Sequence, residues 1–403
     1  MRLKLLVIAP FYDHFIKDLV EAQSKYLEEI HVIVRYNPLN EFSKYLPGVR
    51  YIKHLKAFTK ENLVDISNIP SNVYIHLLPV YYVLPDSVNP ALGNKLVRVF
   101  YEYIIKNKLE FDVIHGHFTY PPGYVAVELG KLFNKPSVIT LHENSLRHIN
   151  SIKKNKRIYS MSAYAWKNAD LLIRVNKRDI KWFIKHGASP ERIVYIPNGY
   201  NPCRLLNVPQ QTARHKIGVS DDQKVIFNLA RLYYEKGHQY LIQAMSEVVK
   251  HRDDVYCFIG GDGPLRGKLQ KQIKDLGLRD HVKLLGFIPD DKLALWYNAA
   301  DLFVLPSLSE GNPTVMFEAL GVGLPFVSTA VGGVPEIITS EDYGLLCPPK
   351  DPECLAEKIL MALEKEWYKE NIRRYAEQFT WENIALTTIE YYKKIIGEQD
   401  EIK

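Results

Sequence analysis

Two carboxylates with seven residues between them are the first candidates for chemistry in this sequence. Glu310 lies in a polar turn after the apolar run Leu302–Leu305, and Glu318 lies in the segment 314–320, which has the pattern of a helix. Open α/β sheets place ligand groups at the carboxyl ends of their strands, where the turn with Glu310 is expected. The free N–H groups and the dipole at a helix start attract phosphate. Glu318 can accept hydrogen bonds from two neighbouring hydroxyls, so the pair indicates a sugar nucleotide.

The residues around this pair decide between a ligand site and an ordinary surface. In the ordinary case Glu310 caps the helix and Glu318 is solvated, because exposed carboxylates are the norm. Four flanking motifs instead resemble the signature of the retaining glycosyltransferases of family 4, which have the GT-B fold. These motifs are PSLSEG (306–311), EAL (318–320), GLP (323–325) and GGVPE (332–336). The resemblance implies that Glu310 contacts the transferred sugar and Glu318 the ribose of the donor.

Two cations follow the apolar run Lys224–Leu229. Arg231 and Lys236 lie five residues apart, between an expected strand end and a helix. From these residues alone, a surface ion pair is the simpler interpretation. A diphosphate does need such a clamp, because a departing nucleotide gains negative charge in the transition state, and arginine and lysine supply a planar fork and a mobile point charge. The Arg…Lys-Gly pattern of the family implies that this pair holds the donor diphosphate.

Further donor contacts are implied by the resemblance. The segment 284–289, LLGFIP, resembles the family segment whose main chain reads the nucleotide base. Main-chain groups belong to every residue and do not choose between uracil, guanine and adenine. We expect a UDP sugar as donor, with a GDP sugar as the alternative. The residues expected to bind the donor are Arg231, Lys236, Gly260, Phe287, Ile288, Glu310, Gly311, Asn312, Pro313, Thr314, Val315 and Glu318.

A histidine stands at the ligand edge of the first half of the chain. His142 follows the buried-looking run Ser137–Leu141. A lone histidine is more often structural than catalytic, but the family keeps one here, facing the reacting carbon of the donor, and the resemblance implies this role for His142. The chain continues with Glu143 and Ser145 where the family has Gly and Asp, a departure that concerns acceptor handling. The expected catalytic residues are His142, Glu310, Arg231 and Lys236.

Metal chemistry is not predicted. His115 and His117 alternate at an expected strand end and could ligate a metal, but the sequence shows no third ligand, so we expect hydrogen-bonded positions that line a cleft. The chain contains no Asp-x-Asp triplet of the type that metal-dependent sugar transferases use, so we predict neither metal nor cofactor. The turn YPPG (120–123) resembles a subset of the family that builds cell-surface polysaccharides.

Composition narrows the class of protein. A chain of 403 residues suits two domains, and 47% hydrophobic with 24% charged residues is typical of a globular protein. Four scattered cysteines without Cys-x-x-Cys spacing predict neither a zinc site nor a disulfide framework and favour a reducing cytosol. No window offers about 18 uninterrupted apolar residues, so no transmembrane helix is predicted. The net charge of +6 is modest and spread out, and we expect no nucleic-acid partner.

One short basic cluster bears on membrane contact. It consists of Lys153, Lys154, Lys156 and Arg157. A solvated helix face or loop is the favoured interpretation, and contact with anionic lipid headgroups or an acceptor's phosphate is the alternative. We therefore expect a cytoplasmic protein and leave open a peripheral contact with the cytoplasmic face of the membrane.

The alternation of short β-rich runs with longer helical patterns predicts βαβ units and parallel sheets. The first turn, APFYDH (9–14), lacks the Gly-x-Gly-x-x-Gly of a dinucleotide-binding domain, which argues against a dehydrogenase. It also lacks the glycine pair that the family often carries. We predict an α/β protein of GT-B type, with two facing Rossmann-like domains and a cleft between them. The expected domains are 1–200 for the acceptor, 201–380 for the donor, and a helix at 381–403 that crosses back to the first domain.

The resemblance implies transfer of a hexose-type sugar from a nucleotide diphosphate sugar to a hydroxyl, with the anomeric configuration retained. The expected acceptor is a sugar or a lipid-linked molecule, in polysaccharide or glycoconjugate synthesis. The implied reaction is a front-face displacement in which the leaving phosphate helps to deprotonate the incoming hydroxyl. Two other classes remain open, namely a GT-B epimerase or phosphorylase and a non-catalytic sugar-nucleotide sensor.

Overall fold

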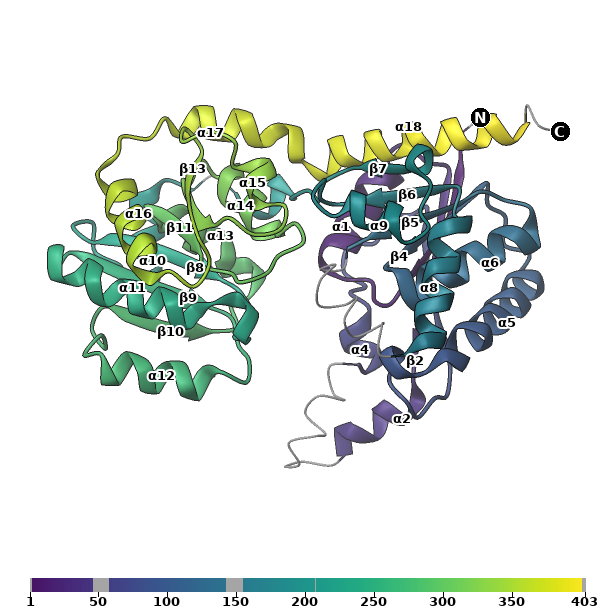
Figure 1. Ribbon diagram of the computed structural model, residues 1–403, viewed down its shortest axis with the longest axis horizontal. Coiled ribbons are helices and arrows are strands. Elements are labelled where there is room, and N and C mark those ends of the chain that lie inside the picture. Colours follow the sequence, from purple (N-terminus) through teal and green to yellow (C-terminus); the bar gives the residue numbers. More distant parts are fainter. Residues whose placement is uncertain (1, 46–57, 143–154, 207, 401–403) are drawn as a thin grey trace. The chain divides into compact units, whose positions relative to one another are not determined.

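The chain folds into two compact units. A computed structural model describes residues 2–45, 58–142, 155–206 and 208–400. Unit 1 comprises Met1–Asn198 together with Trp381–Lys403, and unit 2 comprises Gly199–Thr380 (Figure 1). The chain therefore leaves unit 1 once and returns to it once. Within unit 2 the outgoing and returning segments pair, because Tyr200 N donates to Phe379 O at 3.0 Å.

Unit 1 is built on a parallel sheet of seven strands, in the order β3-β2-β1-β4-β5-β6-β7. The strands are β1 (Lys4–Ala9), β2 (Glu29–Tyr36), β3 (Val73–Pro79), β4 (Val113–His117), β5 (Ser137–Leu141), β6 (Leu171–Arg174) and β7 (Ile193–Tyr195). The helices are α1 (His14–Ser24), α2 (Pro38–Glu41), α4 (Lys60–Leu63), α5 (Pro90–Asn107), α6 (Tyr124–Phe133), α8 (Lys156–Asn168), α9 (Ile180–Lys185) and α18 (Trp381–Asp400).

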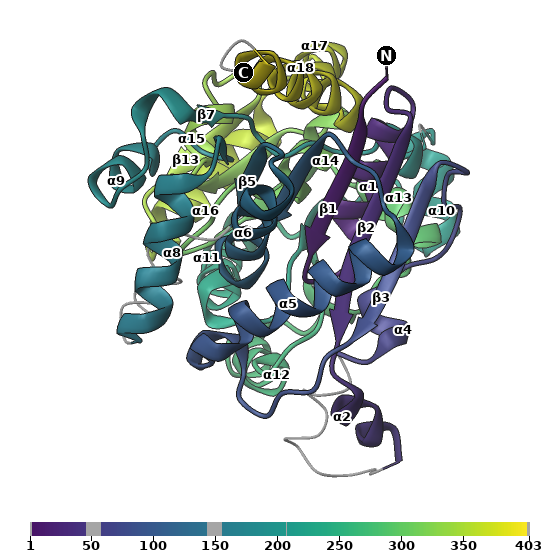
Figure 2. The ribbon, with the colours of Figure 1, turned by 90° about the vertical axis from the view of Figure 1, so that its right-hand side faces the viewer.

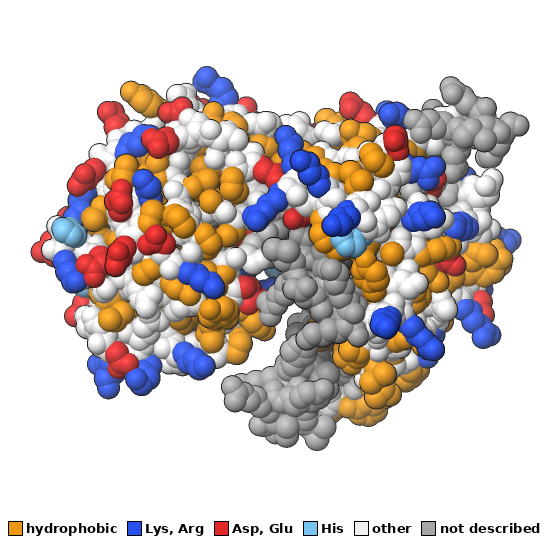
Figure 3. Space-filling view, viewed as in Figure 1, with side chains coloured by type: hydrophobic (Ala, Val, Ile, Leu, Met, Phe, Trp, Pro, Cys, Tyr) orange, Lys and Arg blue, Asp and Glu red, His pale blue; other side chains and the backbone are white. Residues whose placement is uncertain are grey.

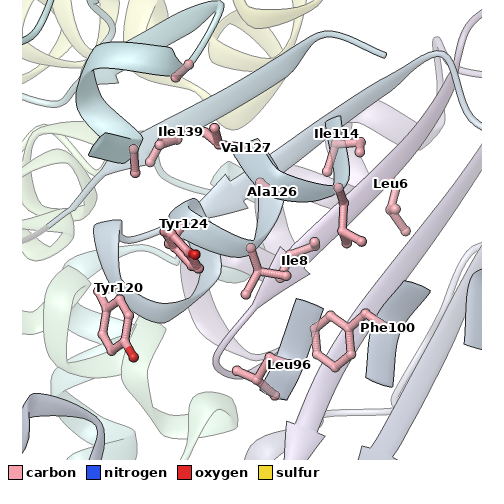
Figure 4. Packing of buried hydrophobic residues seen from close by; sticks show 14 of the residues in the cluster. Leu6, Ile8, Leu96, Phe100, Ile114, Tyr120, Tyr124, Ala126, Val127 and Ile139 are labelled. Carbon is pink, nitrogen blue, oxygen red and sulfur yellow. The ribbon is translucent and has the colours of Figure 1, made fainter. Parts of the chain in front are cut away.

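Helices cover both faces of this sheet because its strands are apolar on both sides. Leu6 and Ile8 of β1 point to the face covered by α5, α6 and α8, where Leu96 and Phe100 pack on them (Figures 2 and 4). Leu5 and Val7 point to the opposite face, which is covered by α1 and α18. Continuous apolar strands of this kind are characteristic of parallel sheets buried on both sides.

Unit 2 has the same design with six parallel strands, in the order β10-β9-β8-β11-β12-β13. The strands are β8 (Lys224–Leu229), β9 (Val255–Gly260), β10 (Val282–Gly286), β11 (Leu302–Leu305), β12 (Phe326–Thr329) and β13 (Gly344–Cys347). The helices are α10 (Gln210–Ile217), α11 (His238–His251), α12 (Arg266–Asp275), α13 (Asp290–Ala299), α14 (Thr314–Gly321), α15 (Val334–Ile337), α16 (Pro352–Glu364) and α17 (Lys369–Ala376).

The two faces of the second sheet pack against different helices. Phe227 and Phe303 belong to one core cluster with α13, α14 and α17, while Ile226 and Val304 belong to the other with α11, α12 and α16. The prediction of two Rossmann-like parallel sheets is confirmed. The sequence analysis did not predict β13.

The surface mixes side chains of all kinds. On the face seen in Figure 3, acidic and basic residues are interspersed with apolar ones. Among the described residues, no helix combines the length and apolar character that crossing a membrane requires.

Candidate active site

The sheet of unit 2 reverses its strand order between β8 and β11, which are adjacent although β9 and β10 lie between them in the sequence. In parallel sheets the carboxyl ends of the strands meet at one edge, and ligands bind where the order reverses. The segment after β8 (residues 230–237, the β8 loop) carries Arg231 and Lys236. The segment after β11 (residues 306–313, the β11 loop) carries Glu310. Both groups of predicted donor contacts therefore lie at the reversal.

The two loops are fixed to each other through their backbones. Leu308 N donates a hydrogen bond to Glu235 O at 2.8 Å. Gly237 has a φ of +69°, and a Cβ there would lie 1.9 Å from the carbonyl oxygen of Pro306. Only glycine permits both this backbone conformation and this close approach. The backbone that carries Lys236 is consequently held against the β11 loop.

Glu310 is a buried carboxylate with two polar partners. Its Oε1 accepts hydrogen bonds from Lys236 Nζ at 2.7 Å and from Ser307 Oγ at 2.6 Å, and the residue is only 8% exposed. A carboxylate at this depth is costly unless it is paired, and the ammonium and hydroxyl supply the pairing. A third loop supports its backbone, because a Cβ on Gly332 would lie 1.9 Å from Glu310 O. The reversal thus holds a preassembled ion pair.

Glu318 lies on α14 and is partly exposed. Its Oε2 accepts a hydrogen bond from Tyr297 Oη at 2.6 Å. Burial, followed by the charge of Glu318, raises the pKa of Tyr297 well above its usual range, so this phenol remains a donor. One of the two oxygens expected to receive ribose hydroxyls therefore already has a protein partner. Tyr297 fixes the orientation of the carboxylate.

The start of α14 follows the β11 loop directly. Its N-cap is Pro313, whose side chain makes no cap hydrogen bond, while in the first turn Met316 N donates to Pro313 O at 3.2 Å. Asn312 and Pro313 are buried, whereas Gly311, Thr314 and Val315 are partly exposed. This arrangement suits an anion that approaches the helix start.

Arg231 is exposed on the β8 loop, with its guanidinium 5.3 Å from the centre of the Tyr233 ring. Stacking on an aromatic face orients the guanidinium plane without neutralising its charge. The loop backbone is tied to the next strand connection, because Leu232 N donates to Asp262 O at 2.9 Å.

The segment expected to read the base, 284–289, begins within the edge strand β10 and continues past its end. Phe287 is 78% exposed, whereas Ile288 is buried and packs so closely that a Cβ on Gly260 would lie 2.5 Å from its Cδ1. Gly261 N donates to Gly286 O at 2.7 Å, which joins the ends of β9 and β10. Two strand spacings, about 10 Å, separate β10 from β8. That separation allows the base to lie at the end of β10 and the diphosphate at the end of β8.

In unit 1 the strand order reverses between β1 and β4, and His142 follows the neighbouring β5. Its Nε2 lies 2.9 Å from Nδ1 of His117, and the two rings are stacked at 14°. Phe15 and Phe118 pack against the His142 ring, with centroids 4.8 and 5.1 Å away. Burial is the main cause that holds the pKa of His142 well below its usual range, and it lowers the pKa of His117 to about 3. Both rings are neutral near pH 7.

The expectation that His115 and His117 line a cleft is wrong. The two side chains are 0% and 1% exposed. His115 Nδ1 lies 2.5 Å from Tyr392 Oη of α18, and its Nε2 lies 2.7 Å from Thr140 Oγ1. His115 therefore fastens α18 to the sheet, and His117 contacts His142 from the interior. Among the described residues, no three His, Cys, Asp or Glu side chains gather to hold a metal ion.

Some residues singled out from the sequence lie outside the described part of the chain. These are Glu143 and Ser145, which follow His142, and Lys153 and Lys154 of the basic cluster. The remaining members of that cluster, Lys156 and Arg157, are exposed at the start of α8.

Sequence reasoning missed two residues that support the site and a buried histidine next to the β8 loop. Ser307 and Tyr297 each donate to one of the paired carboxylates. His238 follows Gly237 and is fully buried, and burial together with the charge of Lys236 lowers its pKa to about 4. Only the position of Ser307, three residues before Glu310 in the recognised motif, could have drawn attention to it.

Comparison with known proteins assigns the family. The model described as Glycosyltransferase Family 4 matches residues 5–204, and the model described as Glycosyl transferases group 1 matches residues 209–379. The uncharacterized glycosyltransferase MJ1607 of Methanocaldococcus jannaschii is 32% identical over 296 residues, which are 70% of this chain and 75% of the relative. The chain belongs to glycosyltransferase family 4. The predicted family is therefore confirmed.

Two further similarities extend this assignment. The putative teichuronic acid biosynthesis glycosyltransferase TuaC of Bacillus subtilis is 26% identical to this family 4 glycosyltransferase over 325 residues, covering 80% of this chain and 79% of TuaC. The crystal structure of Anabaena Alr3699/HepE in complex with UDP shares the fold, with a TM-score of 0.73 at 20% identity over 97% of this chain and 100% of that one. The predicted GT-B fold class is confirmed.

Proposed function

We propose that this family 4 glycosyltransferase moves a hexose-type sugar from a nucleotide diphosphate sugar to a hydroxyl acceptor, with retention of the anomeric configuration. The observation that carries the proposal is the Lys236–Glu310 ion pair at the strand reversal of unit 2, supported by Ser307 and adjoining the start of α14. A cation, an acid and a helix start are the groups that a sugar diphosphate requires.

Each group has a part in holding the donor. Arg231, Lys236 and the first N–H groups of α14 bind the diphosphate and stabilise the charge that develops as it leaves. When the diphosphate arrives, the Lys236 ammonium turns from Glu310 to the phosphate oxygens, and Glu310 accepts from a hydroxyl of the sugar. Glu318, oriented by Tyr297, binds the ribose. The main chain at Gly260, Phe287 and Ile288 contacts the base.

The state of Glu310 supports a front-face reaction. After Lys236 has turned to the phosphate, the carboxylate still accepts from Ser307 Oγ and from the sugar hydroxyl and is mostly buried, which is a poor state for a nucleophile that must attack carbon. In the reaction we propose, the bond between the anomeric carbon and the phosphate oxygen breaks and the acceptor oxygen bonds to the same face of that carbon. The acceptor proton passes to the leaving phosphate. For His142, whose lowered pKa keeps it neutral, we propose the role that the family resemblance implies, a hydrogen bond to the reacting sugar.

Donor and acceptor classes rest on the relatives. The UDP bound by HepE supports a UDP sugar, with a GDP sugar as the competing donor. The name of TuaC supports a role in polysaccharide or glycoconjugate synthesis, with a sugar or lipid-linked acceptor. We further propose that the protein acts in the cytoplasm.

A thermal-shift screen of nucleotide sugars tests the donor site without knowledge of the acceptor. We expect UDP-glucose or UDP-galactose to raise the melting temperature more than GDP-mannose does, and we expect Lys236→Ala to abolish the shift. NMR of the glycoside then reports its anomeric configuration, and inversion would contradict the mechanism. If the donor is isomerised or phosphorolysed and no glycoside forms, the epimerase or phosphorylase is favoured. If Glu310→Gln binds the donor as tightly as the wild type and neither protein turns it over, the sensor is favoured.

Removal of metal ions tests the proposed independence from them. Because cationic side chains and a helix start neutralise the diphosphate, we expect the transfer rate to be unchanged in excess EDTA. A rate that is lost in EDTA and restored by Mg²⁺ or Mn²⁺ would contradict this expectation.

A further inference from the structure

Unit 2 contains a cavity away from the predicted donor site. Its volume is about 390 Å³, within the range of small-molecule sites. Residues from the turn before β13, from the connection between α16 and α17, and from α17 itself line it; these elements are green to yellow in Figure 1. Tyr343 immediately precedes β13 and so marks the amino ends of the strands, whereas the β11 loop follows the carboxyl ends. The cavity and the donor site lie at opposite edges of the sheet.

Aromatic side chains form the walls of this cavity. The rings of Tyr343 and Tyr375 are stacked with centroids 3.8 Å apart and planes 7° apart. Their neighbours fix them, because Tyr375 Oη donates to Ile337 O at 2.6 Å and Trp367 Nε1 donates to Ala362 O at 2.7 Å. Tyr343, Trp367 and Tyr375 also pack on the hydrophobic core of unit 2. The cavity is therefore preformed, which lowers the cost of binding.

One aromatic ring of the cavity is exposed to solvent. Tyr368, the N-cap residue of α17, is 70% exposed. An exposed aromatic ring at the mouth of a cavity provides a flat apolar surface with a hydroxyl at its edge. The C–H faces of pyranose rings are apolar, while their edges carry hydroxyls, so a sugar ring matches this combination.

The polar groups of the cavity are balanced in charge. Two acids, Asp342 and Glu366, and two bases, Lys365 and Arg374, line it, so it has no net charge to attract phosphate or a polyanion. Asn371 adds a planar amide with both donors and acceptors. Carboxylate, guanidinium and amide groups together can donate hydrogen bonds to vicinal hydroxyls and accept hydrogen bonds from them. This chemistry suits a neutral molecule with many hydroxyls.

We propose that this cavity is a non-catalytic binding site for a neutral hexose unit of a saccharide chain. The proposal goes beyond the donor site and does not depend on which sugar is transferred. In an enzyme that builds a glycan, a second site of this kind keeps a growing chain attached between turnovers and raises its concentration near the protein.

The test uses the full chain and two neutral probes, maltohexaose for α-linked and cellohexaose for β-linked hexoses. Saturation-transfer NMR at millimolar saccharide is expected to give a signal from at least one probe. We expect Tyr368→Ala to weaken the affinity about tenfold, in line with the loss of one aromatic contact. Tyr368→Trp should preserve the affinity because the ring surface is kept. Tyr81→Ala, which removes a 60% exposed tyrosine from unit 1, is the matched control and should change nothing.

Two further measurements distinguish binding at this cavity from binding at the donor site. Saccharide binding is expected to persist in saturating UDP and in the Glu310→Gln variant, whatever the donor screen shows. Absence of a signal from both probes would overturn the proposal, as would an affinity unchanged by Tyr368→Ala. Displacement of the saccharide by UDP would place it in the donor site and would equally overturn the proposal.

Discussion

The carboxylate of Glu310 shows how much a single residue in this site depends on its partners. Its burial is tolerable because Lys236 and Ser307 donate to the same oxygen. Breaking a buried pair by removing one partner leaves an uncompensated charge, which is far more costly than the pair is stabilising. Substitutions here therefore report on both folding and catalysis, and the two must be measured together.

Lys236→Ala is expected to slow sugar transfer by two to three orders of magnitude, on the order of 2.7–4 kcal/mol, as for a lost oxyanion donor. The physical reason is the loss of the cation that stabilises the leaving diphosphate. The measurement is the rate of nucleotide release from the donor that gives the largest thermal shift. Lys216→Ala, at an exposed position on α10, is the control, and a near-wild-type rate in Lys236→Ala would remove the assignment.

His117 is expected to position His142 through the contact between their ring nitrogens. His117→Phe leaves Nε2 of His142 without this partner, at a cost of about 1–3 kcal/mol in the free energy of unfolding. His117→Asn should recover much of the loss in stability and in transfer rate, because an amide can replace Nδ1. Urea unfolding and transfer rates of the two variants check this. Equal losses in both would argue that His117 only fills space.

The sequence was sufficient to find the charged members of the site but not their neutral partners. Glu310 and Lys236 stand within recognisable motifs, and their polar character among apolar strands makes them conspicuous. Tyr297 lies 21 residues from its partner Glu318. From the sequence, a tyrosine in this helix is expected to be a core residue, and its hydroxyl gives no sign of a polar partner. Its hydroxyl contact exists only because α13 and α14 contribute to the same core cluster.

At the scale of elements, the β8 and β11 loops act as one rigid piece. Gly237 permits this, because its position leaves no room for a side chain between it and Pro306. A loop held in this way needs little further ordering when a ligand arrives, which lowers the cost of binding.

Gly237→Ala is expected to destabilise the protein by several kcal/mol and to abolish the thermal shift with the donor. Its matched control is Gly277→Ala, which has a similar φ of +71° but nothing within 4 Å of the added Cβ. The control should cost only the strained backbone, roughly 1–2 kcal/mol. Urea unfolding of both variants measures the difference. If the two substitutions proved equally costly, the loops would not be in the close contact described.

Element bounds were predictable where a buried strand ends in a polar turn. The expected strands at Lys224–Leu229 and Leu302–Leu305 coincide with β8 and β11. β13 was missed because four residues that begin with glycine, Gly344–Cys347, carry too weak a pattern, and the strand forms by pairing with β12. Tertiary pairing of this kind overrides local preference.

At the scale of the whole molecule, buried neutral histidines predict sensitivity to acid. The pKa values of His115, His117 and His142 are lowered mainly by burial, and that of His76 is lowered to about 4. The unfolded chain binds protons at these residues below about pH 6.5, whereas the folded chain does not. Above that pH these histidines are neutral in both states, and their contribution to the free energy of unfolding has its full value. It should be lost on acidification, by up to about 1.4 kcal/mol per pH unit for each histidine.

Melting temperatures recorded between about pH 7 and pH 5 check this expectation, which is a steady fall as the pH decreases. A flat profile over this range would contradict the neutral, buried state of the three stacked and bonded histidines.

The two crossings between unit 1 and unit 2 have a consequence for biosynthesis. Trp381, Ile384, Ile389 and Tyr392 cover the face of the first sheet that also packs on α1, yet they are translated after the whole of unit 2. Domains usually complete their folding on the ribosome in the order in which they emerge. Here one apolar face of the nascent first sheet is covered by α1 alone until α18 has been translated, so unit 2 should complete its folding before unit 1 does.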